Sequence, residues 1–272
     1  MDHVTNWEEV MDVQYTDVRV FNNPYLSTTP AVQASQTRGT AYTYQDFAET
    51  NESRTINSFE ILPIFIDRAD LAQSTFSKQM YWADLEGQLF QERIEAIMLG
   101  QHASWTNFGT VSIGGGGAAT DQITVSATNI DDIIRGMKRE IGEANGMKFA
   151  KRNGMFIIWR YTDFEILEAF MQANGFSTAD MALKDGALSG ARYMGVDHLV
   201  SNDHTANHLF AGVKKLGSLG ILNDTYGQIV INQDPPATGA GAVSGIGVVT
   251  RLDYGLAWWN NFDSILFDIN VV

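Results

Sequence analysis

Cysteine is absent from the 272 residues, so disulfide bridges, thiolate metal ligands and cysteine nucleophiles are excluded. Proline is scarce, with five residues in the whole chain. No run of 18 apolar residues occurs, and the sequence therefore predicts no membrane-spanning helix. The first residues, MDHVTNWEEVMD, are acidic and lack the apolar core of a secretory signal peptide.

Charged residues are also few. They make up 18% of the chain, against about 25% in an ordinary soluble domain, whereas 44% of the residues are hydrophobic. A surface with so few charges is expected to be buried against partners, which disfavours a monomer. Eighteen basic residues stand against 32 acidic ones, and no three basic residues are consecutive. Because phosphates are bound by cations, tight binding of nucleic acid is not expected.

Residues 67–103 carry a continuous apolar stripe. Its steps of three and four predict one long helix, with apolar or small residues at Ala72, Phe76, Met80, Ala83, Gly87, Phe90, Ile94 and Ile97. Asp67 is the expected N-cap and Gly100 the expected end. Such a helix would span roughly 50 Å, whereas globular helices average about 11–12 residues. Sustained heptads are absent, so we interpret it as the support of an extended domain rather than as a coiled coil.

Two segments before this helix are expected to contact other chains. Residues 1–36 contain four aromatic residues, which favours an arm that becomes ordered on a neighbour over a disordered tail. Residues 37–66 predict a hairpin with AETNES as its tip. The first strand is polar on both faces, so the hairpin should project and lie on another chain. The expected contact residues are Asp46, Glu49, Asn51, Glu52 and Arg54.

The segments after the long helix mix strands and helices without strict alternation, which predicts the α+β class. Helices are expected over 129–144 and 162–173, with shorter ones at 177–184 and 215–222. Strands are expected on both sides of Gly114–Gly117 and at 155–159, 191–202, 207–215 and 226–232, with closing strands after residue 245. Residues 233–245, which include Pro235 and Pro236, predict a mobile loop.

Candidate chemistry centres on His198, His204 and His208. The last two have H-x-x-x-H spacing, but the intervening residues lack the glutamate of a zinc protease. We interpret the three as solvated loop histidines and keep a metal-dependent enzyme only as a remote alternative. The glycines of GAGAVSG miss the dinucleotide-binding spacing by one residue and are separated from the preceding strand by two prolines. No catalytic, cofactor-binding or metal-binding residue is therefore predicted.

The order of these parts resembles the major capsid proteins of tailed phages, the Hong Kong 97-like fold. A polar hairpin follows an arm and leads into the long helix through FEILPIFIDRADLAQS. The later segments that carry the resemblance are NIDDIIRGMKREIGEANG, GMFIIWRYTDFEIL, ARYMGVDHLVSND and LDYGLAWWNN. The resemblance spans nearly the whole chain and rests on the succession of these segments rather than on any single motif.

The resemblance implies a division of the chain into named parts. Residues 1–36 would be the N-terminal arm and residues 37–66 the extended loop. The spine helix and peripheral domain would hold residues 67–127, with return strands and a loop at 227–257. Pro235 and Pro236 of this loop are further expected contact residues, near a point where three subunits would meet. The axial domain, which surrounds the capsomer axis, would hold residues 128–226 and 258–272.

The implied function is a coat protein without catalysis. It would assemble into hexamers and pentamers around the genome of a tailed double-stranded DNA phage, in the host bacterial cytoplasm, and remain in the virion. Scaffolding, portal and decoration proteins are the further implied partners, and the packaged DNA would not be tightly bound. An encapsulin, a bacterial compartment shell of the same fold, is the closest alternative. The long arm and the long hairpin favour the virus.

Overall fold

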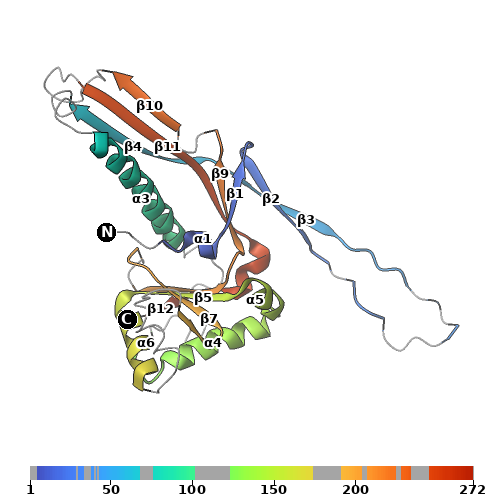
Figure 1. The fold of residues 1–272 in the computed structure, drawn as a ribbon. Coiled ribbons are helices and arrows are strands. Elements are labelled where there is room, and N and C mark those ends of the chain that lie inside the picture. The colour runs from blue at the N-terminus through green and yellow to red at the C-terminus, as the bar shows by residue number, and fades with distance from the viewer. Residues whose placement is uncertain are drawn as a thin grey trace.

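The computed structural model describes residues 5–28, 30–33, 38–39, 41, 43–67, 76–101, 123–173, 191–203, 207–224, 228–233 and 245–271. Within these residues the chain forms two lobes and a projecting hairpin (Figure 1). The upper lobe in this view sets a long helix beside a sheet, and the lower lobe packs helices beneath a second sheet. This mixture confirms the predicted α+β class. No helix in the described part is long and apolar enough to cross a membrane.

The upper sheet is built on β11 (Gly245–Trp258), a strand of 14 residues. The strand order is β1 (Asp12–Thr16), β9 (Gly217–Leu222), β11 and β10 (Gln228–Gln233), and β4 (Ser58–Asp67) also pairs with β11. β4 and β11 are antiparallel, from Asp67 opposite Gly245 to Ser58 opposite Tyr254. β1 is parallel to β9, so a segment close to the N-terminus completes a sheet made mostly of C-terminal strands.

The predicted long helix is confirmed as α3 (Phe76–Gly100), which ends at the expected glycine. Near its C-terminal end, Ile94, Met98 and Leu99 are buried in the core. An ion pair of 3.1 Å between Arg93 and Glu60 also joins α3 to β4. Asp67 is the last residue of β4, and the first turns expected after it, residues 68–75, lie outside the described residues.

The lower sheet has the order β12 (Leu266–Asn270), β8 (His208–Val213), β5 (Met155–Trp159), β7 (Val196–Val200) and β6 (Ala191–Tyr193). Its helices are α4 (Ile130–Glu143), α5 (Met147–Asn153) and α6 (Tyr161–Ala173), with a 3-10 turn at Asn260–Ile265. The isoleucine spacing of α4 does bury one face, and β5 is buried along its whole length, as predicted. The strand expected before Gly114–Gly117 and the helix at 177–184 fall outside the described residues. Of the strand expected after these glycines, residues 123–125 are described, and Ile123 forms an isolated bridge with Val271.

The hairpin differs from its prediction. Its strands are β2 (Val20–Leu26) and β3 (Glu49–Thr55), so AETNES belongs largely to the returning strand and is not the tip. The tip was predicted from the polarity of AETNES alone. A strand that is exposed on both faces can be polar throughout, so polarity does not distinguish such a strand from a turn. The segment expected to continue this strand, 58–67, is instead β4 of the upper sheet.

The first part of the predicted arm is ordered on its own chain. Trp7, Val10 and Met11, around the short helix α1 (Trp7–Val10), are buried in the core. The segment then forms β1 of the upper sheet and β2 of the hairpin. The aromatic content did indicate burial, and the partners that the structure shows for Trp7 and Phe21 lie within the subunit.

Residues 215–222 form strand β9 and not the predicted helical segment. The glycines at 217 and 220 lie on opposite faces of the strand, where large rings fill the space above them. A Cβ atom at Gly217 would lie 2.4 Å from the ring of Trp258, and one at Gly220 would lie 2.8 Å from the ring of Phe21. β9 also pairs with β11, so a segment placed in the axial domain by the expected boundaries belongs to the upper sheet.

Candidate functional site: the hairpin and the junction between the lobes

The hairpin of β2 and β3 projects away from both lobes (Figure 1). Beyond the strands, glutamine side chains continue the pairing between its two arms. Gln45 Nε2 donates to the carbonyl of Ala31 over 2.9 Å, and Gln33 Nε2 donates to the carbonyl of Thr43. These bonds therefore hold the two arms together as far as residues 33 and 43. A two-stranded ribbon of this kind buries little of its own surface, so it is only marginally stable alone in water.

The predicted contact residues are distributed along this ribbon. Asp46 precedes β3, and Glu49, Asn51 and Arg54 lie exposed within it. Glu52 is half-buried and accepts a hydrogen bond of 3.1 Å from the backbone N–H of Asn260, so it anchors the ribbon to its own subunit. Pro235 and Pro236 lie outside the described residues.

Apolar side chains on the ribbon are exposed to a degree unusual for their size. Val32 is 94% exposed and Tyr44 85%, and Leu26 and Phe47 are at least half exposed. The upper sheet shows a similar feature on one face, where Phe59, Ile61 and Phe65 of β4 and Val230 of β10 are exposed. Exposed apolar patches on soluble proteins commonly mark interaction surfaces. The exposed apolar side chains of the ribbon and of the upper sheet are therefore candidate surfaces for contact with other copies of the chain.

The junction between the lobes is polar and buried. Asn6, which precedes α1, donates from Nδ2 to Glu95 of α3 over 3.1 Å and to the carbonyl of Val200 at the end of β7 over 2.9 Å. Its backbone N–H also donates to Glu95. Burial raises the pKa of Glu95, and hydrogen bonds from Ser201 and Asn6 oppose that shift. One asparagine thus joins the long helix to the lower sheet.

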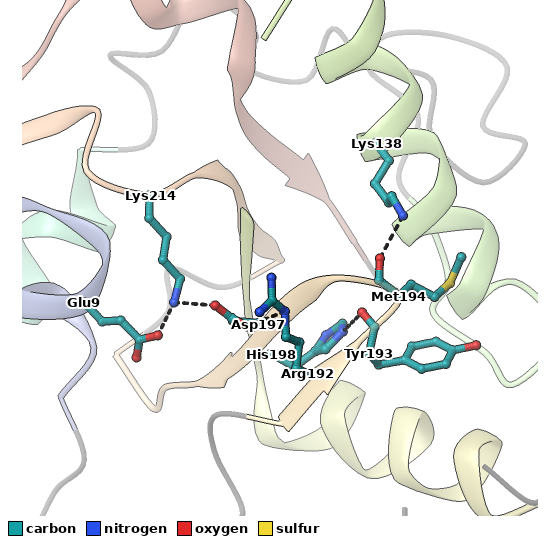
Figure 2. A network of polar contacts seen from close by, with 8 residues as sticks. All are labelled: Glu9, Lys138, Arg192, Tyr193, Met194, Asp197, His198 and Lys214. Atoms are coloured by element: carbon teal, nitrogen blue, oxygen red, sulfur yellow. Dashed lines mark hydrogen bonds and ion pairs between the residues drawn. The ribbon is translucent and has the colours of Figure 1, made fainter. Parts of the chain in front are cut away.

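A second contact joins the same lobes through Lys214 (Figure 2). Its ammonium group is buried between Glu9 of α1 and Asp197 of β7, at 2.7 Å from the latter. Arg192 approaches Asp197 from β6 at 3.6 Å. Lys215 Nζ donates to the carbonyl of Met11 over 2.7 Å. The complementary doublets Glu8-Glu9 and Lys214-Lys215 are the one faint signal of this network in the sequence.

The turn between β6 and β7 belongs to the same network. Met194 and Gly195 both adopt positive φ angles, 53° and 78°, as a two-residue hairpin turn requires. Lys138 of α4 donates to the carbonyl of Met194 over 2.8 Å, which fixes the turn against the helix. The segment predicted as one strand is therefore two short strands joined by a tight turn.

The histidines are not a cluster of solvated loop residues, and that interpretation is wrong for the two that the structure describes. His198 is fully buried in β7, where Nδ1 accepts a 2.8 Å hydrogen bond from the indole of Trp159. Nε2 therefore carries the proton and lies 3.3 Å from the carbonyl of Tyr193. Burial lowers the pKa of His198 to about 4. His208 pairs with Asp268 at 3.0 Å, and His204 lies outside the described residues.

His198 and His208 therefore do not present free ring nitrogens to a shared metal site. Both ring nitrogens of His198 have hydrogen-bond partners, and His208 is oriented by a carboxylate of β12. Within the described ranges, no group of three His, Asp or Glu residues could hold a metal ion.

Comparisons with known proteins concern the whole chain. No family model matches the sequence, and no curated protein matches it. Solved structures do match: a chain of Gordonia phage Cozz has a TM-score of 0.70 at 10% identity, covering 100% of this chain and 88% of that one. A chain of Mycobacterium phage Che8 has a TM-score of 0.64 at 12% identity, covering 93% and 84%. The capsid of an empty gene transfer agent (GTA) particle has a TM-score of 0.63 at 12% identity, covering 98% and 90%.

These three similarities cover at least 93% of this chain and at least 84% of each matched chain. They include capsid structures, in agreement with the resemblance found in the sequence. The chain has the Hong Kong 97-like α+β fold of tailed-phage major capsid proteins.

Proposed function

We propose that the chain is the major capsid protein of a tailed double-stranded DNA phage and assembles into the closed shell of the virion. The observation that carries the proposal is the hairpin, a ribbon with exposed apolar side chains and no core of its own. In a shell, such a ribbon lies on the next subunit and becomes buried. The chain is a structural component in this account, and its assembly into hexamers and pentamers is its activity.

The hairpin supplies the first contact between subunits. Asp46 and Glu49 are exposed carboxylates that would meet cations of a neighbour, whereas the nearby Leu26 and Phe47 supply apolar area. Glu52 serves mainly to anchor the ribbon through Asn260. The loop at 233–245, with Pro235 and Pro236, would lie where three subunits meet, as its position in the family implies.

The alternative of a bacterial compartment shell rests on a similar fold. The content of the particles distinguishes the two functions. Particles isolated from a natural source should contain double-stranded DNA, and a cargo enzyme in its place would support the compartment.

The shell is not expected to bind its DNA tightly. The chain carries a net charge of −14, and binding to phosphates depends on the release of counterions by cations. Weak attraction would let packaged DNA slide and later leave. Duplex DNA mixed with empty shells at low salt should stay unbound, and binding with a steep inverse salt dependence would contradict this part of the proposal.

The metal-dependent enzyme of the sequence analysis is not supported. His198 and His208 are engaged in separate contacts of the lower lobe, with Trp159 and Asp268 respectively. A metal assay on the purified protein tests this alternative directly. A stoichiometric zinc or iron content would revive it.

A further inference from the structure

The lower lobe carries opposite charges at two separate places. α5, with the sequence MKFAKRN, has three cations and no carboxylate. α6, with the sequence YTDFEILEAFMQA, has three carboxylates and no cation. In Figure 1 the two helices lie at opposite sides of the lobe, and α4 runs between them. α4 has 14 residues and is therefore about 20 Å long, which keeps the two charged helices apart within one subunit.

Two of the three cations of α5 contact side chains of their own helix. Lys148 and Arg152 lie over the ring of Phe149, and Arg152 Nε donates to the side chain of Asn153 over 3.0 Å. Lys148, Lys151 and Arg152 are exposed, and the structure records no ion pair between them and any described carboxylate. Most other described basic residues contact a carboxylate or a carbonyl, as Lys214 and Arg251 do. Three uncompensated cations within five positions are therefore exceptional in a chain of net charge −14.

α5 holds these cations rigidly. Phe149 packs edge-on against Phe262 with ring centroids 5.2 Å apart, and Ala150 is buried. A Cβ atom at Gly146, just before the helix, would lie 2.5 Å from the side chain of Ile265, so the entry to the helix is tightly packed. The buried side fixes the helix, and the charged side chains at positions 148, 151 and 152 share the opposite side.

The carboxylates of α6 are arranged in a corresponding way. Asp163 is buried and paired with Arg160 at 2.6 Å, so it contributes little free charge. Glu165 is exposed and Glu168 half-buried, and neither forms an ion pair within the described ranges. Together with the exposed Tyr161 they follow an i, i+4, i+7 pattern, which places all three along one stripe of the helix.

We propose that the cationic side of α5 docks on the acidic stripe of α6 of a second copy of the chain. A contact between two different patches, at opposite sides of one lobe, is head-to-tail, and repeating it generates a ring when the rotation between subunits closes. Charge complementarity favours this partner: cations at 148, 151 and 152 would meet Glu165 and Glu168, and the exposed Met147 and Tyr161 would supply apolar area. Like-charged juxtaposition would disfavour the reversed orientations α5–α5 and α6–α6.

The contact deepens the proposed function, because it rests on assembly of the chain into rings within a shell. It differs from the hairpin contact in location and in physical character. Exposed ion pairs contribute mostly to orientation and association rate, and they are screened by salt. Raising the salt concentration should therefore weaken assembly, and this salt effect should be smaller when the charged side chains of α5 and α6 are removed.

The test reverses each set of charges and then both. The variants are K148E/K151E on α5, E165K/E168K on α6 and the quadruple variant that combines them. Each double variant should raise the protein concentration needed for assembly roughly tenfold at low salt. The quadruple variant should restore it to within a few-fold, because every interface then regains opposite charges. A control, R19E/R139E, makes the same change of net charge as K148E/K151E at two exposed arginines outside both helices and should assemble nearly normally.

The outcomes separate this inference from the proposed function. If the unaltered chain forms no shells, the proposed function fails. If it forms shells and the α5 and α6 variants assemble as well as the control, only the α5–α6 contact is refuted. Impaired double variants without recovery in the quadruple variant would also refute it, provided that circular dichroism shows folded subunits. Normal assembly of K148E/K151E with lost retention of duplex DNA would assign the cations to nucleic acid instead.

Discussion

The indole N–H of Trp159 donates a hydrogen bond of 2.8 Å to Nδ1 of His198, and both side chains are fully buried between neighbouring strands of the lower sheet. The rings also stack, with centroids 6.0 Å apart. A proton added at Nδ1 would break this bond and place a charge in the core. The histidine therefore remains neutral in the folded subunit, which links the stability of the lower lobe to pH.

Acid should destabilise the subunit through His198. Its pKa is lowered to about 4 in the folded chain from 6.5, so the unfolded chain binds the extra proton first as the pH falls below 6.5. The stability that the neutral histidine provides is present at pH 7 and decreases as the pH falls toward 4. By pH 4.5, the free energy of unfolding should have fallen by about 2–3 kcal/mol. Urea unfolding of His198→Gln subunits at pH 7 and 4.5 should show a smaller pH effect than the unaltered chain. An equal pH effect in both proteins would contradict the assignment.

Removing the buried ammonium at the junction should loosen the N-terminal segment. Lys214→Ala leaves Glu9 and Asp197 without their shared cation, and we expect a loss of about 2–3 kcal/mol in the free energy of unfolding. Limited proteolysis should then cleave near residues 5–11 sooner. Arg192→Ala is the matched control, because its 3.6 Å ion pair with Asp197 is exposed and should contribute less than about 1 kcal/mol. Equal losses in the two variants would argue against a junction centred on Lys214.

A methyl group at Gly217 should disrupt the upper sheet. The added Cβ would lie 2.4 Å from the Trp258 ring, and overpacking of this kind costs about 1–3 kcal/mol. Gly87→Ala in α3 is the control, since nothing lies within 4 Å of its Cβ position and alanine favours a helix by about 0.5–1 kcal/mol. Thermal unfolding should move down for the first variant and up for the second. A neutral Gly217→Ala would show that Trp258 can move aside.

Shortening the hairpin should separate folding from assembly. Leu26 and Glu49 are directly paired, and the next pair, Ser27 and Ala48, is hydrogen-bonded over 2.9 Å, so an Asn-Gly turn can replace residues 28–47 without disturbing the register of β2 and β3. The subunit should keep its melting temperature, because the removed part has no described contact with either lobe's core. Light scattering should show that assembly is lost. Normal shells from this variant would mean that the hairpin is not an essential contact, and a lower melting temperature would mean that it supports its own subunit.

Several elements could be predicted from the sequence because their signals are local. In α4 the isoleucines recur at helical spacing because one face of the helix is buried, and in β5 the short apolar run shows that the whole strand is buried. The long helix α3 was recognised in the same way. Resemblance in the order of segments then indicated the fold, although no single motif was specific.

The predictions that failed concern elements whose secondary structure depends on pairing or packing with residues far away in the sequence. β9 is a strand because β1 and β11 pair with it, and its glycines are required by Phe21 and Trp258 from remote segments. The true strands of the hairpin are set by pairing between residues 20–26 and 49–55, across a long polar insertion. The network at Lys214 and the charge separation between α5 and α6 likewise depend on three-dimensional placement, which a linear pattern does not show.

The central claim is that this chain builds a closed shell, and electron microscopy of the purified, recombinant protein tests it most directly. Preparations across a range of salt and protein concentrations should contain closed particles with fivefold and sixfold clusters of subunits. Analytical ultracentrifugation should report a species many times heavier than the 30.1 kDa chain. A stable monomer under all of these conditions, with circular dichroism showing that it is folded, would contradict the account.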